Sequence, residues 1–556
     1  MNSSKRKFFF SYLFFLFLTV LLYFSTRNSG FVSDFLGWQY NFDNYPFVSV
    51  INGDAYHIKR FYHFTHLLLY AITSAFRLWG LPWFLLFSVL FALNAFLVLK
   101  IFGKIFKDLK LENGFSIAFI GVLMFMVSPY QTEVMVWRAS FHYLTSFAMM
   151  LAIVYLSIRY VETSLIKYWI ISSFIFLCSV FSLEFFLFTP FVVFLFILFQ
   201  WVNFPGSFDI KKNMVRLVGI PLLMIGGYFI MYKNVHHNWI AHYGVENHSQ
   251  ILSLKSFATY EKYVIKYLGF IRYFKHTAKE SIYGVFDISL ISTMVLCGIL
   301  SIFFLGVISF KKASVRQRLL LLNFSLFSLL LIPVITLYFP YVLFTEGDRL
   351  GYMASAFLFM GVSLMLSYLP KSIYYSIAFF LIMISISLTI KTNNFWSKSE
   401  KVFSSIVKKY ESWDTSKQVL ILNTPDNYEG VPMFRSYDNT SAVKEAIELY
   451  NRRKLNASFM EVAGYNMTAP DNGVHIRVDS ADQIMVIFNQ WGNWWWRKGI
   501  GASDYETEDY QVQFNYQGCG NCYKLTLKNN NDRVLLFQTG DRFKKVDITK
   551  QHIEQW

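Results

Sequence analysis

The chain has 556 residues, of which 55% are hydrophobic and only 15% are charged. Soluble domains carry about 25% charged residues, so this composition excludes a soluble protein and indicates an integral membrane protein with membrane lipid as a partner. The formal net charge of +16 does not indicate a nucleic-acid partner. Lysine and arginine gather on the cytoplasmic loops of membrane proteins, and no groove-reading motif accompanies them here.

Apolar segments recur along the chain as far as residue 390. A spanning helix needs about 20 apolar residues, and by this measure we predict a polytopic α-helical membrane protein with about eleven transmembrane helices. The stretch 164–201 is long enough for two spans, and Glu184 marks the turn between them. The predicted spans lie near 8–25, 81–101, 115–130, 141–158, 167–182, 184–201, 214–232, 287–310, 319–339, 351–369 and 372–390.

The sign of the charges alternates between the loops that join these spans. Basic loops face the cytoplasm, so we expect a protein of the inner (cell) membrane with a cytoplasmic N-terminus. The inner loops then carry Lys100, Lys104, Lys107, Lys110, Arg159, Lys167, Lys211, Lys212, Arg216, Lys311, Lys312, Arg316, Arg318 and Lys371. The outer loops carry Asp34, Asp43, Asp54, Glu133, Glu184, Glu346 and Asp348.

One outer loop, 233–286, departs from this pattern because it is basic. Long translocated loops are only weakly bound by the charge rule. The periodicity of 255–275 predicts an amphipathic helix that lies on the outer membrane surface. The segment 57–79 is apolar but contains several histidines and arginines, and we interpret it as one or two further helices on that surface. The cations of the long loop are Lys255, Lys262, Lys266, Arg272 and Lys275.

After the predicted membrane domain 1–395, residues 396–556 are polar and predict a small soluble α+β domain. An odd number of spans and an inner start make this domain extracytoplasmic, where Cys519 and Cys522 would form a small disulfide loop. The run Trp494-Trp495-Trp496, after Trp491, predicts stacking on carbohydrate or a place in the lipid interface. A buried strand is the alternative, although three consecutive indoles cannot all face one core. The predicted elements are helices near 397–411 and 441–452 and strands at 418–422, 484–489 and 511–516.

Ionisable groups at membrane depth are costly and are therefore candidates for function. Asp34 follows the first span, where a carboxylate can accept the proton of an attacking hydroxyl; an ordinary helix-end acid is the alternative. Glu133 and Trp137 are four residues apart and share a helix face, with Arg138 next in sequence. An acid beside an indole suits a sugar, whereas an interfacial tryptophan with a solvated glutamate is the alternative.

Two further outer sites carry charge. Glu184 lies at a turn that has no glycine or asparagine signal, and a solvated turn residue is the alternative reading. Asp348 and Arg349 open the tenth span, where a guanidinium can bind phosphate in a bidentate way; a surface ion pair between the two is the alternative. The histidines His236, His237, His242 and His248 lack the spacing of a metal site.

Four short motifs occur in order: Val32-Ser33-Asp34-Phe35, then Pro129 with Glu133-Val134 and Trp137, then Ser182-Leu183-Glu184, then Asp348-Arg349-Leu350-Gly351-Tyr352. After the last span, Asn394-Phe395-Trp396 resembles a recurring exit motif. Together the motifs resemble those of the GT-C class of polytopic glycosyltransferases. The similarity is to the membrane portion of tetratricopeptide-linked O-mannosyltransferases and their bacterial relatives. The chain departs from that pattern where Phe35 replaces a second acid and Ala354 replaces a proline, and no tetratricopeptide repeat follows.

The resemblance implies a transferase that moves a sugar from a polyprenyl-phosphate donor to a hydroxyl acceptor on a protein, lipid or glycan. It implies that Asp34 is the catalytic base and that Arg349 stabilises the departing phosphate. It also implies substrate contacts by Glu133, Trp137, Arg138, Glu184, Asp348 and Tyr352. No cofactor is certain, and since Phe35 removes one acid of the family pair, a divalent metal is left open.

Three other functions stay open at this point. A flippase or transporter for lipid-linked saccharides would need charges inside the bundle towards both leaflets, whereas the acids here lie on one side. A polysaccharide polymerase is not separable by sequence from a single-sugar transferase. A non-catalytic scaffold would bind glycans through Trp491 and Trp494–Trp496.

Overall fold

The computed structural model describes residues 3–52, 61–206, 209–237, 239, 253–308, 312–335, 337, 347–411, 413, 417–434, 441–490, 494–496, 503–514, 516–528 and 532–556. The chain divides into two compact units. The helical unit comprises Met1–Arg27 and Phe47–Asn393. The sheet unit comprises Asn28–Pro46 and Asn394–Trp556.

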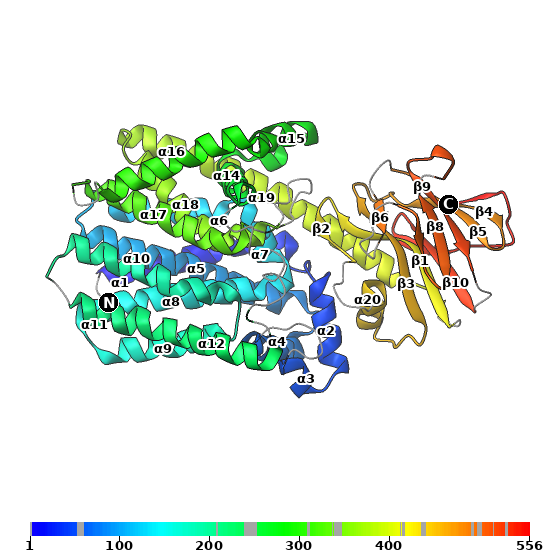
Figure 1. Cartoon of the computed structure of the whole chain (residues 1–556), viewed down its shortest axis with the longest axis horizontal. Helices are drawn as coiled ribbons and strands as arrows, with labels where there is room; N and C mark the ends of the chain where they lie inside the picture. Colours follow the sequence, from blue (N-terminus) through cyan, green and yellow to red (C-terminus); the bar gives the residue numbers. More distant parts are fainter. Residues whose placement is uncertain are drawn as a thin grey trace. The chain divides into compact units, whose positions relative to one another are not determined.

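The helical unit is built mainly from apolar helices (Figure 1). Its helices are α1 (Ser3–Tyr23), α3 (Phe47–Asn52), α4 (His63–Phe76), α5 (Gly80–Asp108), α6 (Gly114–Val127), α7 (Thr132–Val136), α8 (Phe141–Thr163), α9 (Ile166–Val180), α10 (Thr189–Asn203), α11 (Ile210–Met214), α12 (Ile220–His236), α14 (Leu254–Gly269), α15 (His276–Gly284), α16 (Ser289–Ile308), α17 (Val315–Leu331), α18 (Tyr352–Leu366) and the part of α19 (Lys371–Lys408) up to Asn393. The short turns used below are η3 (Pro129–Gln131), η4 (Arg138–Ser140), η5 (Glu184–Phe188), η8 (Ile271–Tyr273) and η11 (Asp348–Gly351).

The helix lengths are those of a polytopic membrane protein. In the described part of the chain, eight helices are long and apolar enough to cross a bilayer, and ten are if each of two bent helix pairs is one span. Every predicted apolar segment contains a helix, but α9 has only 15 residues, fewer than the about 20 that a span needs. Helix length and composition therefore support eight to ten spans in the described residues, fewer than the about eleven that the sequence predicts.

The core of the helical unit forms around α5, which packs against α1, α6 and α8. Trp83, Phe87 and Phe91 of α5 are fully buried. α6 approaches α18 closely, because a Cβ on Gly121 would lie only 3.1 Å from the backbone of Met360. Small residues permit such close approach between membrane helices.

The two ends of the helical unit differ in charge. Figure 1 shows α4 and α7 at one end, here called the α7 end, and the N-terminus with α11 at the other. The N-terminal end carries exposed ion pairs, among them Lys104 with Asp108 at 3.1 Å and with Glu162 at 2.6 Å. These pairs lie in the loops that the sequence predicts to be basic.

The sheet unit contains two sheets, one mixed and one antiparallel. In the mixed sheet, in the order β11-β10-β1-β3-β6, the central strand β1 runs parallel to both β10 and β3, with Val419 opposite Val534 and Phe459. The antiparallel sheet has the order β12-β4-β5-β9-β8-β7. The elements are α2 (Asp34–Asn44), β1 (Gln418–Tyr428), β2 (Val431–Pro432), α20 (Ala442–Asn451), β3 (Ser458–Met467), β4 (Val474–Ser480), β5 (Gln483–Phe488), β6 (Trp494–Trp496), β7 (Tyr505–Glu506), β8 (Tyr510–Phe514), β9 (Cys522–Leu527), β10 (Arg533–Thr539), β11 (Arg542–Lys545) and β12 (Glu554–Gln555).

The predicted helix near 441–452 and the three predicted strands are present as α20, β1, β5 and β8. The helix predicted at 397–411 is not separate, because α19 continues without a break to Lys408. Cys519 and Cys522 form the expected disulfide.

The tryptophan run follows the alternative reading, a buried strand. In β6 the side chains alternate, so Trp494 and Trp496 are buried while Trp495 is partly exposed. Trp494 stacks on Phe488 of β5 with ring centroids 5.0 Å apart, and Trp496 donates a hydrogen bond to the Ser503 carbonyl at 2.6 Å. Two of the three indoles are therefore core residues and not a glycan surface. Trp491 lies outside the described residues.

Candidate functional site

A bent helix places the first acid of the site. α6 ends at Val127, and the helix that starts at Pro129 is turned by 59° from it. A proline lacks the backbone N–H and disfavours helix in the residue before it, so Pro129 accounts for the break. The short helix α7 that follows carries Glu133, which is only 2% exposed.

Glu133 is held by Arg349 from η11. The Arg349 guanidinium (Nη1) donates to Glu133 Oε1 at 2.6 Å, and the Arg349 backbone N–H donates to Oε2 at 2.7 Å. The Arg349 guanidinium also lies 4.8 Å from the ring centroid of Trp137. Both carboxylate oxygens are thus engaged, and Arg349, with a side chain that is 25% exposed, is the most accessible charge of the group.

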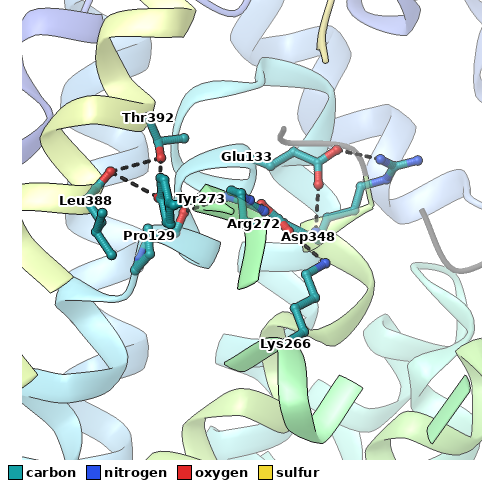
Figure 2. Close-up of polar contacts among 9 residues, drawn as sticks. Pro129, Glu133, Lys266, Arg272, Tyr273, Asp348, Leu388 and Thr392 are labelled. Atoms are coloured by element: carbon teal, nitrogen blue, oxygen red, sulfur yellow. Dashed lines mark hydrogen bonds and ion pairs between the residues drawn. The ribbon is translucent and has the colours of Figure 1, made fainter. Parts of the chain in front are cut away.

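Asp348, the neighbour of Arg349, is fully buried and faces the opposite way. It forms ion pairs with Lys266 of α14 at 2.8 Å and with Arg272 of η8 (Figure 2). Arg272 also donates to the Pro129 carbonyl at 3.4 Å and lies over the Tyr130 ring at 4.5 Å. One carboxylate therefore joins α14, η8 and η11 to the turn that precedes α7.

These five residues, here called the charge cluster, are Glu133, Lys266, Arg272, Asp348 and Arg349. Three cations face two carboxylates, so the charge cluster carries one net positive charge. Burial lowers the pKa of the Lys266 ammonium, and the Asp348 carboxylate opposes that shift. For Arg272 burial also disfavours the charge, but the Asp348 carboxylate outweighs it and raises the pKa of the guanidinium. Asp348 thus favours the charged form of both buried cations.

Aromatic side chains surround the charge cluster. A Cβ on Gly351 would come within 3.0 Å of Tyr267 Cζ, with the Tyr267 hydroxyl closer still, so only glycine lets α14 lie this close to η11. Tyr273 donates to the Leu388 carbonyl at 3.1 Å and lies 2.7 Å from the Thr392 hydroxyl (Figure 2). Among the described residues, the Tyr130 and Tyr267 hydroxyls are buried with no hydrogen-bond partner.

The structure brings Glu133, Trp137 and Arg349 together, as the sequence analysis expects of a substrate site. It separates Asp348 from Arg349, because each pairs with different partners. Arg138 and Tyr352 are fully buried. Arg138 donates to the Met135 and Arg27 carbonyls, both at 3.3 Å, and Tyr352 accepts from Asn94 at 3.0 Å. These two predicted contact residues therefore have structural partners.

Glu184 begins η5 and accepts a hydrogen bond from the Tyr62 hydroxyl at 2.5 Å. The Tyr62 ring lies 6.4 Å from the ring of His142, at the start of α8. Phe185, which follows Glu184, packs edge-on against Tyr143, which follows His142, with ring centroids 6.2 Å apart. Glu184 thus belongs to a second polar group, at the start of α8.

Asp34 belongs to the sheet unit. It is the first residue of α2, is half-buried, and accepts a hydrogen bond from Ser33 Oγ at 3.3 Å. Ser33 has φ 57° and ψ −132°, a strained backbone for a residue other than glycine. Such strain persists only where the surroundings hold it and is often found at functional positions.

Lys266 and Arg272 belong to the site but were not among the predicted site residues. The sequence predicts that 255–275 form an amphipathic helix on the membrane surface, whereas Lys262, Lys266 and Arg272 are buried in the structure. The signal was present, because these cations are the ones that made the outer loop 233–286 depart from the charge pattern. An excess of cations in an outer loop predicts buried acidic partners elsewhere.

Among the described residues, no three His, Cys, Asp or Glu side chains are grouped so that they could hold a metal ion. Asp54, Glu346, His242 and His248 lie outside the described residues. No family model and no curated protein matches this chain.

Proposed function

We propose that the protein is a membrane glycosyltransferase that moves a sugar from a polyprenyl-phosphate donor to a hydroxyl acceptor. The observation that carries the proposal is the charge cluster at the α7 end of the helical unit. It is buried, has one net positive charge, and leaves Arg349 as its most accessible member.

The chemistry explains why such a group would serve this reaction. When the bond between sugar and phosphate breaks, negative charge grows on the departing lipid phosphate. A guanidinium already fixed in place stabilises that charge more in the transition state than in the ground state. Glu133 fixes Arg349 through both carboxylate oxygens, and the buried Trp137 ring packs against the guanidinium and helps to hold it in place.

Asp34 is proposed as the general base that takes the proton of the acceptor hydroxyl. The strained backbone at Ser33 directly before it supports a functional position. Glu184, with Tyr62, is proposed to bind hydroxyl groups of the sugar or the acceptor, because a carboxylate accepts hydrogen bonds that such hydroxyls donate. Direct displacement would invert the anomeric centre. The site is proposed to face outward, with the basic N-terminal end of the helical unit in the cytoplasm.

The test compares surface glycans and glycoproteins by mass spectrometry in cells that lack the protein and in cells that carry variants of it. Arg349→Lys keeps the charge but loses the planar fork, and we expect transfer to fall about 100-fold or more. Asp34→Asn is expected to abolish transfer at unchanged expression.

Arg159→Lys is the matched control, because Arg159 forms an exposed pair with Glu162 at 3.0 Å. We expect this control to retain full transfer. Glycans that do not change when the protein is absent, or normal transfer by Arg349→Lys and Asp34→Asn, would contradict the proposal. Movement of a lipid-linked saccharide across vesicle membranes without any acceptor would instead favour a flippase or transporter. Repeated addition to one acceptor would indicate a polymerase.

A further inference from the structure

We propose that the C-terminal part of the sheet unit is a holder for the segment 28–46, and that residues of α20 are positioning residues for Asp34. This inference rests on the proposed function for its catalytic consequence, but the holding itself is measured independently. It assigns a role to residues 394–556 that the glycan-binding hypothesis does not.

The segment 28–46 groups with the C-terminal residues and not with the helices that flank it in sequence. Within this unit α2 lies against α20. The approach is close at Gly37, where a Cβ would lie 3.7 Å from Glu445 Oε2. A helix of 11 residues is too short to be stable alone in water, so α2 depends on this packing.

Hydrogen bonds secure the segment on both sides of Asp34. Before it, the Ser33 N–H donates to the Met433 carbonyl at 3.1 Å, and the Tyr450 hydroxyl donates to the Phe31 carbonyl at 3.4 Å. At the far end of α2, the Lys454 ammonium donates to the Asn44 side chain. Three separate parts of the C-terminal chain thus contact a segment of fewer than twenty residues.

The residues of the holder also pack against one another. Tyr450 packs edge-on against Phe403 of α19 with ring centroids 5.6 Å apart, and Phe403 lies 4.7 Å from the ring of Phe434. Asn451, at the end of α20, donates to the Val407 carbonyl at 3.2 Å. α20, the end of α19 and the chain after β2 therefore form one frame behind the segment.

The strained backbone of Ser33 shows what this frame does. A non-glycine residue does not keep φ 57° with ψ −132° unless neighbouring contacts impose it. The contact that reaches Ser33 itself comes from Met433, and its geometry sets the direction in which the next residue, Asp34, starts α2. A base held within a narrow range of positions is what proton transfer requires.

The test uses the full-length protein in lipid with two variants, Tyr450→Phe and Ser33→Val. Tyr450→Phe keeps the ring and removes the hydroxyl, which bonds the Phe31 carbonyl and also contacts Glu400. Ser33→Val places a β-branched residue at a positive φ. For both we expect amide hydrogen exchange in the peptides that cover 29–44 to become about tenfold faster, the order expected for one lost hydrogen bond. We also expect kcat for sugar transfer to fall about tenfold or more, with KM for the donor unchanged and the pH profile of kcat shifted.

Two controls separate positioning from general damage. Ser33→Gly permits the same backbone without strain and is expected to keep wild-type exchange at 29–44. Its kcat is not used as a control, because the change also removes the hydrogen bond from Ser33 Oγ to Asp34. Lys528→Gln removes an ion pair with Glu506, 2.5 Å in length, in the antiparallel sheet and is expected to leave exchange at 29–44 unchanged. Wild-type exchange in both Tyr450→Phe and Ser33→Val would overturn the inference. If Asp34→Asn is inactive, faster exchange in these variants with no change in kcat or in its pH profile would also overturn it. If Asp34→Asn is itself active, the proposed function fails, and the exchange data alone then decide whether the segment is held.

Discussion

At the scale of single residues, Asp348 determines whether the charge cluster can exist. Lys266 and Arg272 are buried with it. Without a carboxylate, the desolvation of these two cations would strongly destabilise the folded state. Arg349 does not depend on Asp348 for its charge, because it has its own carboxylate in Glu133. The two acids therefore have different roles: Asp348 stabilises the fold, and Glu133 orients the accessible guanidinium of Arg349.

Asp348→Asn tests this division. Removing one partner of a buried ion pair costs about 3–5 kcal/mol, so we expect a large fall in thermal stability in detergent or lipid. The matched change Asp108→Asn removes a carboxylate that pairs with Lys104 at the surface, where such a pair is worth about 0–1 kcal/mol. Equal stability of the two variants would contradict the role assigned to Asp348.

A second residue prediction concerns pH. His66 on α4 is 3% exposed, and burial lowers the pKa of its imidazole to about 4 from 6.5. Because the folded state binds this proton more weakly than the unfolded state, the stability contributed by neutral His66 is complete above pH 6.5. It is lost as pH falls towards 4, by at most about 3 kcal/mol. Thermal unfolding between pH 7 and 4.5 should show a smaller pH dependence for His66→Gln than for the wild type.

The sequence predicted part of the site at this scale. Glu133, Trp137 and Arg349 could be selected because charge and aromatic residues at membrane depth are unusual, and the structure brings them together. Asp348 could be selected for the same reason, but its partners could not. Lys266 and Arg272 are 82 and 76 residues away in sequence, and nothing local to Asp348 indicates a contact across that distance.

At the scale of elements, α14 shows the limit of periodicity as a predictor. The pattern of 255–275 correctly predicts an amphipathic helix, but periodicity does not say what the polar face contacts. In the structure Lys262 and Lys266 are buried. Lys266 pairs with the buried Asp348, and Lys262 pairs with Asp287, whose side chain is 62% exposed. The polar face of α14 can be buried at Lys266 because the buried Asp348 carboxylate neutralises that cation.

The break between α6 and α7 and the continuity of α19 can both be explained from the local sequence, unlike the contacts of α14. Pro129 is visible in the sequence and accounts for the bend of 59°. The 38 residues of α19 contain no proline or glycine, so the change from apolar to polar composition near residue 391 has no effect on the helix itself. Composition marks a change of surroundings, whereas helix ends follow from backbone chemistry.

Strand β6 gives a prediction at this scale. Trp496 is fully buried, and its loss to alanine should cost about 3–5 kcal/mol. Trp495 lies on the other face and is partly exposed, so Trp495→Ala should cost roughly half of that or less. Denaturant unfolding of the full chain, followed by tryptophan fluorescence, checks the order. If Trp495→Ala were the more damaging change, the side-chain alternation assigned to β6 would be wrong.

At the scale of the whole molecule, the charges of the helical unit define two chemically different ends. The N-terminal end carries exposed pairs of Lys104, Arg159 and Lys371 with acids, whereas four of the five members of the charge cluster at the α7 end are buried. The sequence predicts basic inner loops and acidic outer loops, and this orientation stays a prediction. The sequence could not predict that 28–46 groups with the C-terminal residues, because the contacts of Ser33 and Asn44 lie about four hundred residues away in the chain.

Single-cysteine labelling tests the orientation proposed for the two ends. In a background without Cys178, Cys297, Cys519 and Cys522, exposed positions are Ser372, at the start of α19, and Thr277, on α15. We expect Thr277→Cys to react in intact cells with a thiol reagent that does not cross membranes. Ser372→Cys should react only after the membrane is opened. The reverse result would place the charge cluster on the cytoplasmic side.

The indoles of β6 carry one further consequence. The rings of Trp494 and Trp496 lie 5.0 Å apart at an angle of 72°, close enough for their electronic transitions to couple. Coupled indoles held in a fixed chiral arrangement give a paired positive and negative band in circular dichroism. The sheet unit therefore carries its own optical reporter, and its melting can be followed separately from the helical signal without attaching a dye.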